Sequence, residues 1–299
     1  MTPSLLGRPI LLPEVDHTPA RSHVQRLDAV RHSDRRVRLR FLSGRSDHNV
    51  PAPDEVTSLL VAVLSPIGDS LFATPAISQL RRQFSEAQLT VLCWASNADI
   101  FVGNSDVDEI WTAESGTEIP HWLHEVQESR FDVAVGLSSV GSWLVALSGA
   151  RWRVGYPIAS VDHFFTQRIA DRRSLHAIDY NLEVAAAVGG DRRFTPMRVA
   201  IGPREHEMVE RLLTEMSVPV GPPLVAIHPG GTYFPAKRWY PEGFSEVADT
   251  LIEQEGVIIC FIGGDDDVQL AERITSLMRH PAVSLAGRLT LRQTGAFLQ

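Results

Sequence analysis

The stretch LLVAVLSPIGDSLFATPAISQLRRQF, residues Leu59–Phe84, decides the fold class of this chain. It opens on an unbroken apolar run of strand length, and Ala73, Ala76, Leu80 and Phe84 then recur at helical spacing. Similar apolar runs alternate with helical stretches along the rest of the chain. Short, continuous apolar strands that alternate with helices predict a parallel sheet covered on both faces. We therefore expect an α/β fold.

Two α/β units are expected to follow one another. The first holds strands at Leu59–Leu64, Leu89–Cys93, Val107–Trp111, Phe131–Leu137 and Arg153–Tyr156, then a helix at His176–Val188. The second holds strands at Leu224–Ile227, Val257–Ile262 and Ala282–Leu285, helices at Pro241–Gln254 and Val268–Met278, and another helix from about Thr290. Three strands are too few for a complete doubly wound domain. We expect domains over residues 56–205 and 206–299, the second one incomplete.

Residues 1–55 have a different composition. Eight arginines crowd residues 21–45, which show little apolar periodicity: Arg21, Arg26, Arg31, Arg35, Arg36, Arg38, Arg40 and Arg45. One interpretation is a disordered, solvated leader; the other is an arm that contacts anionic lipid head groups. The acidic residues interspersed among the arginines favour the leader.

Composition narrows the class of function. The 299 residues carry a formal net charge of -8, which argues against a general nucleic-acid binder. No apolar run approaches the roughly 18 residues that span a bilayer. The two cysteines, Cys93 and Cys260, lie in expected strands and are predicted to be inert packing thiols in a reducing compartment. The expected location is the cytoplasm.

Ligands of open parallel sheets bind beyond the carboxyl ends of the strands, so four loops are candidates. In the first, Ser65–Ser70, Gly68 allows close backbone approach and Asp69 could accept a proton from a hydroxyl. The alternative is that Asp69 only caps the following helix. In the second loop, Gly230 and Gly231 could turn backbone amides toward an anion that Lys237 would neutralise. The alternative there is an ordinary turn.

The other two loops have weaker signals. Asp265, Asp266 and Asp267 could hold a divalent metal, bind ribose hydroxyls, or cap the next helix without binding a ligand. The stretch Gly136–Gly141 nearly matches the G-x-S-x-G turn of α/β-hydrolases around Ser138, but its spacing is wrong. A plain turn with a serine cap is the expected structure. No G-x-G-x-x-G follows a strand, so a nicotinamide or flavin cofactor lacks its signature.

Four blocks of the sequence together resemble glycosyltransferase family 9, the ADP-heptose:lipopolysaccharide heptosyltransferases. They are LLVAVLSPIGDSLFATPAISQLRRQFSEAQLTVL, then GARWRVGY with HAIDYNLEVAAAVGG, then VAIHPGGTYFPAKRWYPEGFSEVADTLIEQEGVIICFIGGDDD, and last SLAGRLTLRQTGAFL. The resemblance runs from about Leu59 to the end of the chain. Its most specific features are the S-x-x-G-D loop of the first block and the H-P-G…K-R-W pattern of the third.

The resemblance implies a GT-B architecture of two Rossmann-like domains that face each other across a cleft. It also implies inverting transfer of a heptose-like sugar from a nucleotide-diphosphate donor, with no obligatory metal and no cofactor, to a hydroxyl of a lipopolysaccharide or other surface-glycan acceptor. Asp69 matches the family's proposed catalytic base, and Gly68 lies beside it. Lys237 and Thr232 match contacts to the donor diphosphate, and Asp267 lies near an acidic ribose contact. Peripheral contact with the inner membrane would fit such an acceptor.

One family feature is missing. Members of the family continue through a D-S-G-P-x-H-type segment that helps to hold the donor phosphates, and this chain ends before it. We therefore expect a truncated chain. A second hypothesis is a degenerate homologue that binds a sugar nucleotide without turnover, which the retained Asp69 and Lys237 oppose. An α/β-hydrolase built on Ser138 is the third hypothesis, and the broken motif argues against it.

Overall fold

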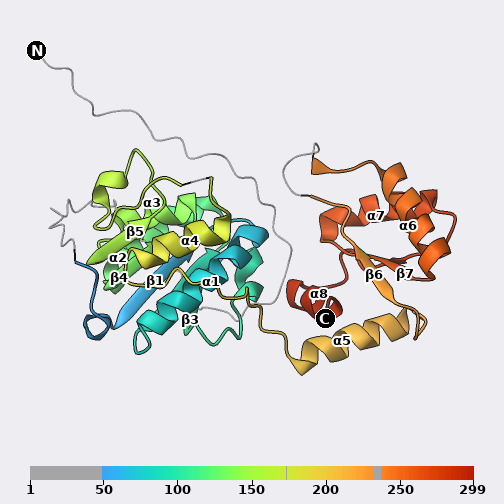
Figure 1. Ribbon diagram of the computed structural model, residues 1–299, viewed down its shortest axis with the longest axis horizontal. Coiled ribbons are helices and arrows are strands. Elements are labelled where there is room, and N and C mark those ends of the chain that lie inside the picture. The colour runs from blue at the N-terminus through green and yellow to red at the C-terminus, as the bar shows by residue number, and fades with distance from the viewer. Residues whose placement is uncertain (1–48, 173, 232–236) are drawn as a thin grey trace, which may run out of the picture. The chain divides into compact units, whose positions relative to one another are not determined.

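A computed structural model describes residues 49–172, 174–231 and 237–299, and the chain divides into two compact units (Figure 1). Among the described residues, the first unit comprises 49–98 and Ser105–Met197, and the second Asp99–Asn104 and Arg198–Gln299. Each unit contains one parallel sheet with its own covering helices. The expected α/β class is therefore confirmed.

The first unit is built on a five-stranded parallel sheet. Its strands are β1 (Ser58–Val63), β2 (Gln88–Trp94), β3 (Glu109–Ala113), β4 (Val133–Gly136) and β5 (Trp152–Gly155). They lie in the order β3-β2-β1-β4-β5, and β1 is central. Successive strands thus run outward from β1 first in one direction and then in the other. Doubly wound sheets place their ligand sites at such a reversal, here between β1 and β4.

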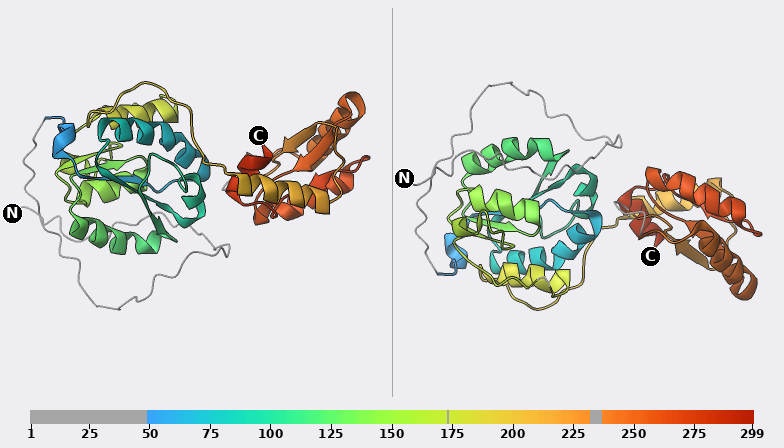
Figure 2. Two further views of the ribbon diagram at one scale, coloured as in Figure 1. Left: turned by 90° about the horizontal axis from the view of Figure 1, so that it is seen from below. Right: turned by 90° about the horizontal axis from the view of Figure 1, so that it is seen from above.

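Helices cover both faces of this sheet (Figure 2). Helices α1 (Ile67–Gln83) and α4 (Ala177–Ala186) lie together on one face, and α2 (Ile119–Ser129) and α3 (Ser139–Leu147) on the other. Alternate residues of β1 point to opposite faces, and Leu60 and Ala62 join the cluster that contains Leu144 and Val145 of α3. Burial on both sides explains why β1 is apolar throughout.

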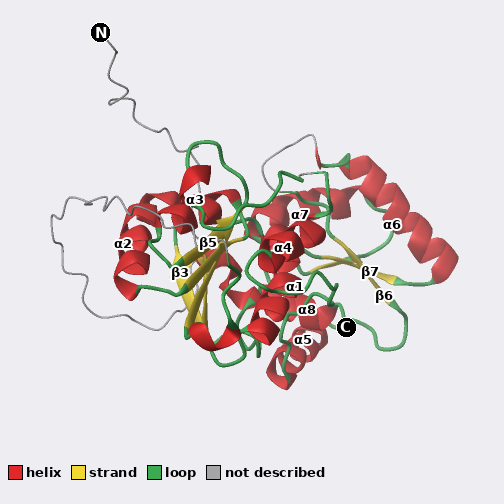
Figure 3. Cartoon of the chain, turned by 60° about the vertical axis from the view of Figure 1, so that its left-hand side comes forward, coloured by secondary structure: helices red, strands yellow, loops and turns green. Residues whose placement is uncertain are grey.

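The second unit is a smaller sandwich of helices around three parallel strands. Strands β6 (Leu224–Ile227), β7 (Ile258–Phe261) and β8 (Val283–Ser284) lie in that order. Helices α6 (Pro241–Glu255) and α7 (Val268–Leu277) pack on Ile259 and Phe261. Helices α5 (Pro203–Glu215) and α8 (Leu291–Phe297) contact each other and cover the opposite face, where Cys260 lies (Figure 3).

The structure differs from expectation at the start of the second unit. Helix α5 was not predicted, and the expected domain boundary between residues 205 and 206 falls inside it. The compact units instead divide between residues 197 and 198. The physical reason is that Leu212 and Leu213 of α5 pack against the β7 and β8 side chains of the second unit. Glu205 accepts a hydrogen bond from the Gly202 amide at 2.9 Å and so caps this helix.

The boundary of the expected leader also shifts. Residues 1–48, with the eight arginines of residues 21–45, lie outside the described residues, but residues 49–55 belong to the first unit. The Asn49 carbonyl accepts a hydrogen bond from Trp152 Nε1 at 3.1 Å, and a 3-10 turn forms at Pro53–Glu55. Among the described residues, no helix has both the length and the apolarity needed to cross a membrane.

Candidate active site

Asp69 lies in the first turn of α1, directly beyond the buried strand β1. Helix α1 begins at Ile67, its capping residue is Pro66, and no side chain caps its amides. The alternative interpretation of Asp69 as a helix cap is therefore wrong. The Asp69 side chain is exposed, as is Gly68 beside it, where an added Cβ would meet nothing within 4 Å. The carboxylate is thus presented by the strand-to-helix turn after β1.

Asp69 borders a cavity of about 430 Å³ at the carboxyl ends of β1, β4 and β5. All of its lining residues belong to the first unit: Leu64, Ser65, Pro66, Asp69, Leu137, Ser138, Ser139, Val140, Tyr156, Pro157, Leu175, Ala177, Tyr180 and Asn181. This is the reversal of strand order at which doubly wound sheets bind ligands. Apart from Asp69, the lining combines apolar side chains with hydroxyl and amide groups, a mixture typical of small-molecule sites.

Tyr156 and Asn181 form a fixed polar wall of the cavity. The Tyr156 hydroxyl donates to Asn181 Oδ1 at 2.5 Å, and Asn181 Nδ2 donates to the Phe72 carbonyl of α1 at 3.0 Å. The Tyr156 ring stacks on Tyr180 with centroids 4.6 Å apart. Burial raises the pKa of Tyr156, and the nearby Tyr180 and Asp69 raise it further. Tyr156 therefore stays a neutral hydrogen-bond donor at physiological pH, within the electrostatic reach of Asp69.

Sequence reasoning missed these wall residues. It also missed Asn97, whose amide donates to the Ser65 carbonyl at 2.6 Å and to Ser70 Oγ at 3.1 Å, so that it braces both ends of the Asp69 loop. A usable signal existed for Tyr156, because it is a polar residue at the carboxyl end of the expected strand Arg153–Tyr156, at the ligand-binding edge. No local pattern distinguishes Asn97 or Asn181 from ordinary surface residues.

Ser138 is the N-cap of α3. Its hydroxyl accepts a hydrogen bond from the Gly141 amide at 3.0 Å, and the residue is buried. The predicted plain turn with a serine cap is confirmed. Because this hydroxyl group caps a helix rather than pointing from a strained turn, the hydrolase hypothesis has no structural support.

In the second unit, the loops after β6 and β7 bring most of the predicted donor-side residues together. Gly230 contacts the Asp267 carboxylate, and an added Cβ on Gly231 would lie 3.8 Å from Lys237 Cβ. Lys237 is exposed. Thr232 lies outside the described residues. Gly230, Gly231, Lys237 and Asp267 thus lie in the loops at one edge of this sheet.

Asp267 is more buried than a solvated cap would be. It is 8% exposed, accepts a hydrogen bond from the Gly264 amide at 3.1 Å, and lies 3.4 Å from His228 Nε2. Asp265 and Asp266 are exposed. Within the described parts of the chain, no group of three or more His, Cys, Asp or Glu side chains has a metal-binding arrangement. The three aspartates therefore do not converge on one point.

Comparison with known proteins identifies the family to which the chain belongs. The model of glycosyltransferase family 9 (heptosyltransferase) matches residues 121–299, which is more than half of the chain. The chain belongs to glycosyltransferase family 9. Lipopolysaccharide heptosyltransferase 3 of Escherichia coli is 25% identical to this family 9 chain over 254 residues, which cover 77% of this chain and 72% of that protein.

Solved structures show the fold of this family 9 chain. The glycosyltransferase family 9 structure from Veillonella parvula matches with a TM-score of 0.71 at 20% identity, over 80% of this chain and 72% of that one. The E. coli ADP-heptose lipopolysaccharide heptosyltransferase II matches with a TM-score of 0.64 at 19% identity, over 81% and 76%. The fold class is GT-B, and the described residues form a five-stranded and a three-stranded Rossmann-like sheet.

Proposed function

We propose that this chain is an inverting glycosyltransferase that moves a heptose-like sugar from an ADP-sugar or other nucleotide-sugar donor to a hydroxyl of a lipopolysaccharide or other surface-glycan acceptor. The observation that carries the proposal is the placement of Asp69, exposed on the strand-to-helix turn at the rim of the cavity between β1 and β4. Membership of family 9 supports the reaction class, and the similar E. coli protein is described as an ADP-heptose enzyme.

The chemistry assigned to the first unit is general-base catalysis. A hydroxyl of the acceptor enters the cavity, and Asp69 takes its proton as the oxygen attacks the anomeric carbon of the donor sugar. The bond from that carbon to the diphosphate oxygen breaks on the opposite side, which inverts the configuration. The bonding electrons leave with the nucleotide diphosphate. A positioned base of this kind contributes about 10²–10⁴ to the rate.

The chemistry assigned to the second unit is stabilisation of the leaving group. The amides of Gly230 and Gly231 and the ammonium group of Lys237 are assigned to the diphosphate, together with Thr232. Preorganised donors and charges aimed at a developing anion are commonly the largest contribution to catalysis. These residues take over the charge neutralisation that a metal ion performs in other transferases. We propose that neither a metal nor a cofactor is required.

The proposed location is the cytoplasm, with peripheral contact to the membrane face where such acceptors are assembled. Two features support this location. The mature acceptor class is lipid-linked, and the N-terminal 48 residues carry the eight arginines that could approach anionic head groups. No nucleic acid partner is proposed, because the chain carries a net charge of -8.

Asp69→Asn tests the base. The substitution keeps the shape of the side chain and removes its basicity, so release of ADP from ADP-heptose in the presence of lipopolysaccharide-core acceptor should fall by about 10²–10⁴. The affinity for ADP should stay the same. Asp179→Asn is the matched control, because Asp179 is an exposed acid in the first turn of the neighbouring α4. Unchanged turnover in the Asp69→Asn protein would remove this residue from the mechanism.

Lys237→Ala tests the proposed binding site for the departing diphosphate. Loss of the ammonium group should weaken ADP binding about tenfold, the usual scale for one charge-assisted hydrogen bond. Isothermal titration calorimetry measures the affinity for ADP. The control is Arg273→Ala, which removes an exposed cation from α7 of the same unit. Equal ADP affinity in the Lys237→Ala and unsubstituted proteins would contradict the assignment.

Chelation tests the metal independence of the transfer. Dialysis against EDTA should leave the transfer rate unchanged, since Lys237 and backbone amides are proposed to carry the diphosphate charge. A rate abolished by EDTA and restored by Mg²⁺ would show that a metal takes part. ADP-heptose binding without turnover on any acceptor would instead favour the non-catalytic homologue.

A further inference from the structure

Asp267 occupies an unusual place for a residue that is expected to bind ribose. It lies between the glycine turns that follow β6 and β7, and only 12% of its side chain is exposed. The Gly264 amide donates to its Oδ2 atom at 3.1 Å. The carboxylate is thus held by the protein on one side and offers little surface to a ligand.

Both glycine turns are shaped around this carboxylate. A Cβ on Gly230 would lie 1.9 Å from Asp267 Oδ1, and a Cβ on Gly263 would lie 2.6 Å from Oδ2. Gly263 also has a φ of 158°, which disfavours other residues. Only glycine at these two positions lets the carboxylate lie where it does. The first turn, at Gly230 and Gly231, is the one assigned to the donor diphosphate.

His228 completes the arrangement from the end of β6. Its Nε2 atom lies 3.4 Å from Asp267 Oδ2, and its side chain is 50% exposed. One buried carboxylate therefore contacts the imidazole, the Gly230 backbone and the Gly264 amide at once. Such a contact fixes the loop after β6 against the loop after β7.

We infer that Asp267 is a positioning residue of the diphosphate-binding site, not a ribose contact. Its carboxylate holds His228 and the Gly230 turn in place, so that the imidazole and the amides of Gly230 and Gly231 are presented to the diphosphate. The inference rests on the proposed function, because it takes this loop to be the donor site. It assigns His228 to the same anion-binding group as Lys237.

Two probes separate positioning from ribose recognition. Calorimetry on the full chain measures the affinities for ADP and for inorganic diphosphate, which has no ribose. In the Asp267→Ala protein both affinities should fall by the same factor, about tenfold. Loss of a ribose contact would lower the affinity for ADP and leave that for diphosphate unchanged. That result, or no loss with either probe, would overturn the inference.

A conservative variant distinguishes lost positioning from misfolding, and a control variant distinguishes it from a general charge effect. Asp267→Asn keeps the side-chain shape and one acceptor oxygen, so it should fold with an unchanged unfolding midpoint and still lose affinity for both probes, by less than Asp267→Ala. Asp266→Asn removes one charge from the same turn at an exposed position and should leave both affinities unchanged. Equal losses in the Asp266→Asn and Asp267→Asn proteins would show a general charge effect and overturn the inference.

A double substitution measures the coupling of Asp267 to the glycine turn. Gly230→Ala alone should lower diphosphate affinity, because its methyl group displaces the carboxylate. The three atoms nearest to a Cβ on Gly230 all belong to the Asp267 carboxylate, so in the Asp267→Ala background adding Gly230→Ala should cost little more. Fully additive losses would overturn the inference. An unsubstituted protein that binds neither probe would overturn the proposed function as well, whereas binding of both probes with additive losses overturns only the inference.

Discussion

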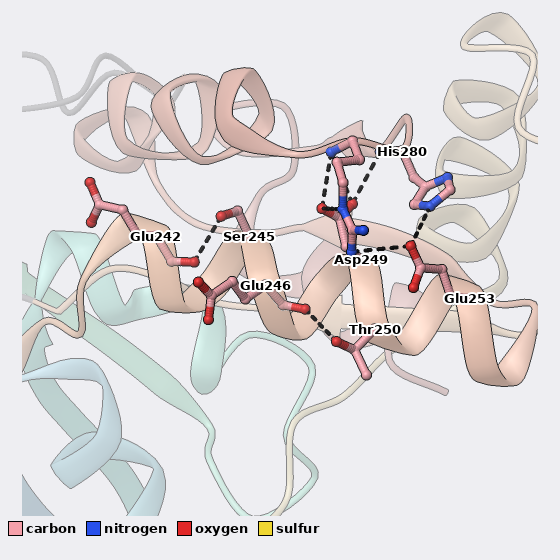
Figure 4. Close-up of polar contacts among 8 residues, drawn as sticks. Glu242, Ser245, Glu246, Asp249, Thr250, Glu253 and His280 are labelled. Carbon is pink, nitrogen blue, oxygen red and sulfur yellow. Dashed lines mark hydrogen bonds and ion pairs between the residues drawn. The ribbon is translucent and has the colours of Figure 1, made fainter.

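Asp249 shows how one buried carboxylate can organise part of the second unit (Figure 4). It lies on α6 and is 3% exposed. The amides of Arg279 and His280, after α7, donate to it at 3.0–3.1 Å, and Arg279 Nε lies 3.3 Å away. Burial by itself would raise the pKa of Asp249, but these hydrogen bonds and the guanidinium charge hold it below its ordinary value. The carboxylate thus ties α6 to the chain that leads into β8.

Asp249→Ala should therefore lower the free energy of unfolding of the second unit by about 1–3 kcal/mol, because two partly buried amides lose their acceptor. A folded pKa below the unfolded one means that this contribution is complete above the ordinary aspartate pKa of about 3.9 and is lost as the pH falls through the folded value. Hydrogen exchange of β7 amides measures the change. Glu246→Ala, at an exposed acid of the same helix, should change it by less than about 0.5 kcal/mol.

The site residues identified from the sequence have local signatures, and of those it missed only Tyr156 has one. Asp69 and Gly230 follow strands directly, so the rule about strand ends finds them. Asn97 and Asn181 matter only because the fold carries them to the Asp69 loop and to Tyr156. The burial of Asp267 could not be predicted either, since it depends on how closely two loops approach.

At the scale of elements, α3 lies unusually close to the central strand. An added Cβ on Gly141 would lie 2.3 Å from the Ala62 carbonyl oxygen of β1. Gly141→Ala should therefore push the helix away from the sheet and lower the free energy of unfolding of the first unit by about 1–3 kcal/mol. Gly116→Ala is the control, since a Cβ there would meet nothing within 4 Å. Urea unfolding compares the two proteins, and equal midpoints would contradict this reading of the α3 contact.

Element prediction succeeded where the apolar pattern is strong and failed where few residues are buried. The central strand β1 is apolar throughout because helices cover both of its faces, which the sequence displays directly. Helix α5 carries only one buried residue, Val209, in a charged sequence, so its periodicity is hard to see. Strand β3 begins at Glu109, two residues later than expected, because Asp108 instead caps the neighbouring strand by accepting a hydrogen bond from the Leu89 amide at 2.7 Å.

At the scale of the whole molecule, separate cores imply separate responses to ligand. Each unit buries its own cluster, around Leu60 and Leu144 in the first and around Ile259 and Phe261 in the second. The four described residues that we propose for the donor side, Gly230, Gly231, Lys237 and Asp267, belong to the second unit. A ligand that binds only the folded form of one unit stabilises that unit by mass action.

ADP should therefore protect the two units unequally against hydrogen exchange. At a concentration about 100 times its Kd, ADP should raise the opening free energy of β7 amides by about 2.7 kcal/mol, while β1 amides, which lie in the other core, change far less. Inorganic phosphate at the same concentration controls for ionic strength. The Lys237→Ala protein should need more ADP for the same protection. Protection confined to β1 would place the nucleotide in the first unit. The assignment of the catalytic base and the diphosphate-binding residues to separate sheets would then be wrong.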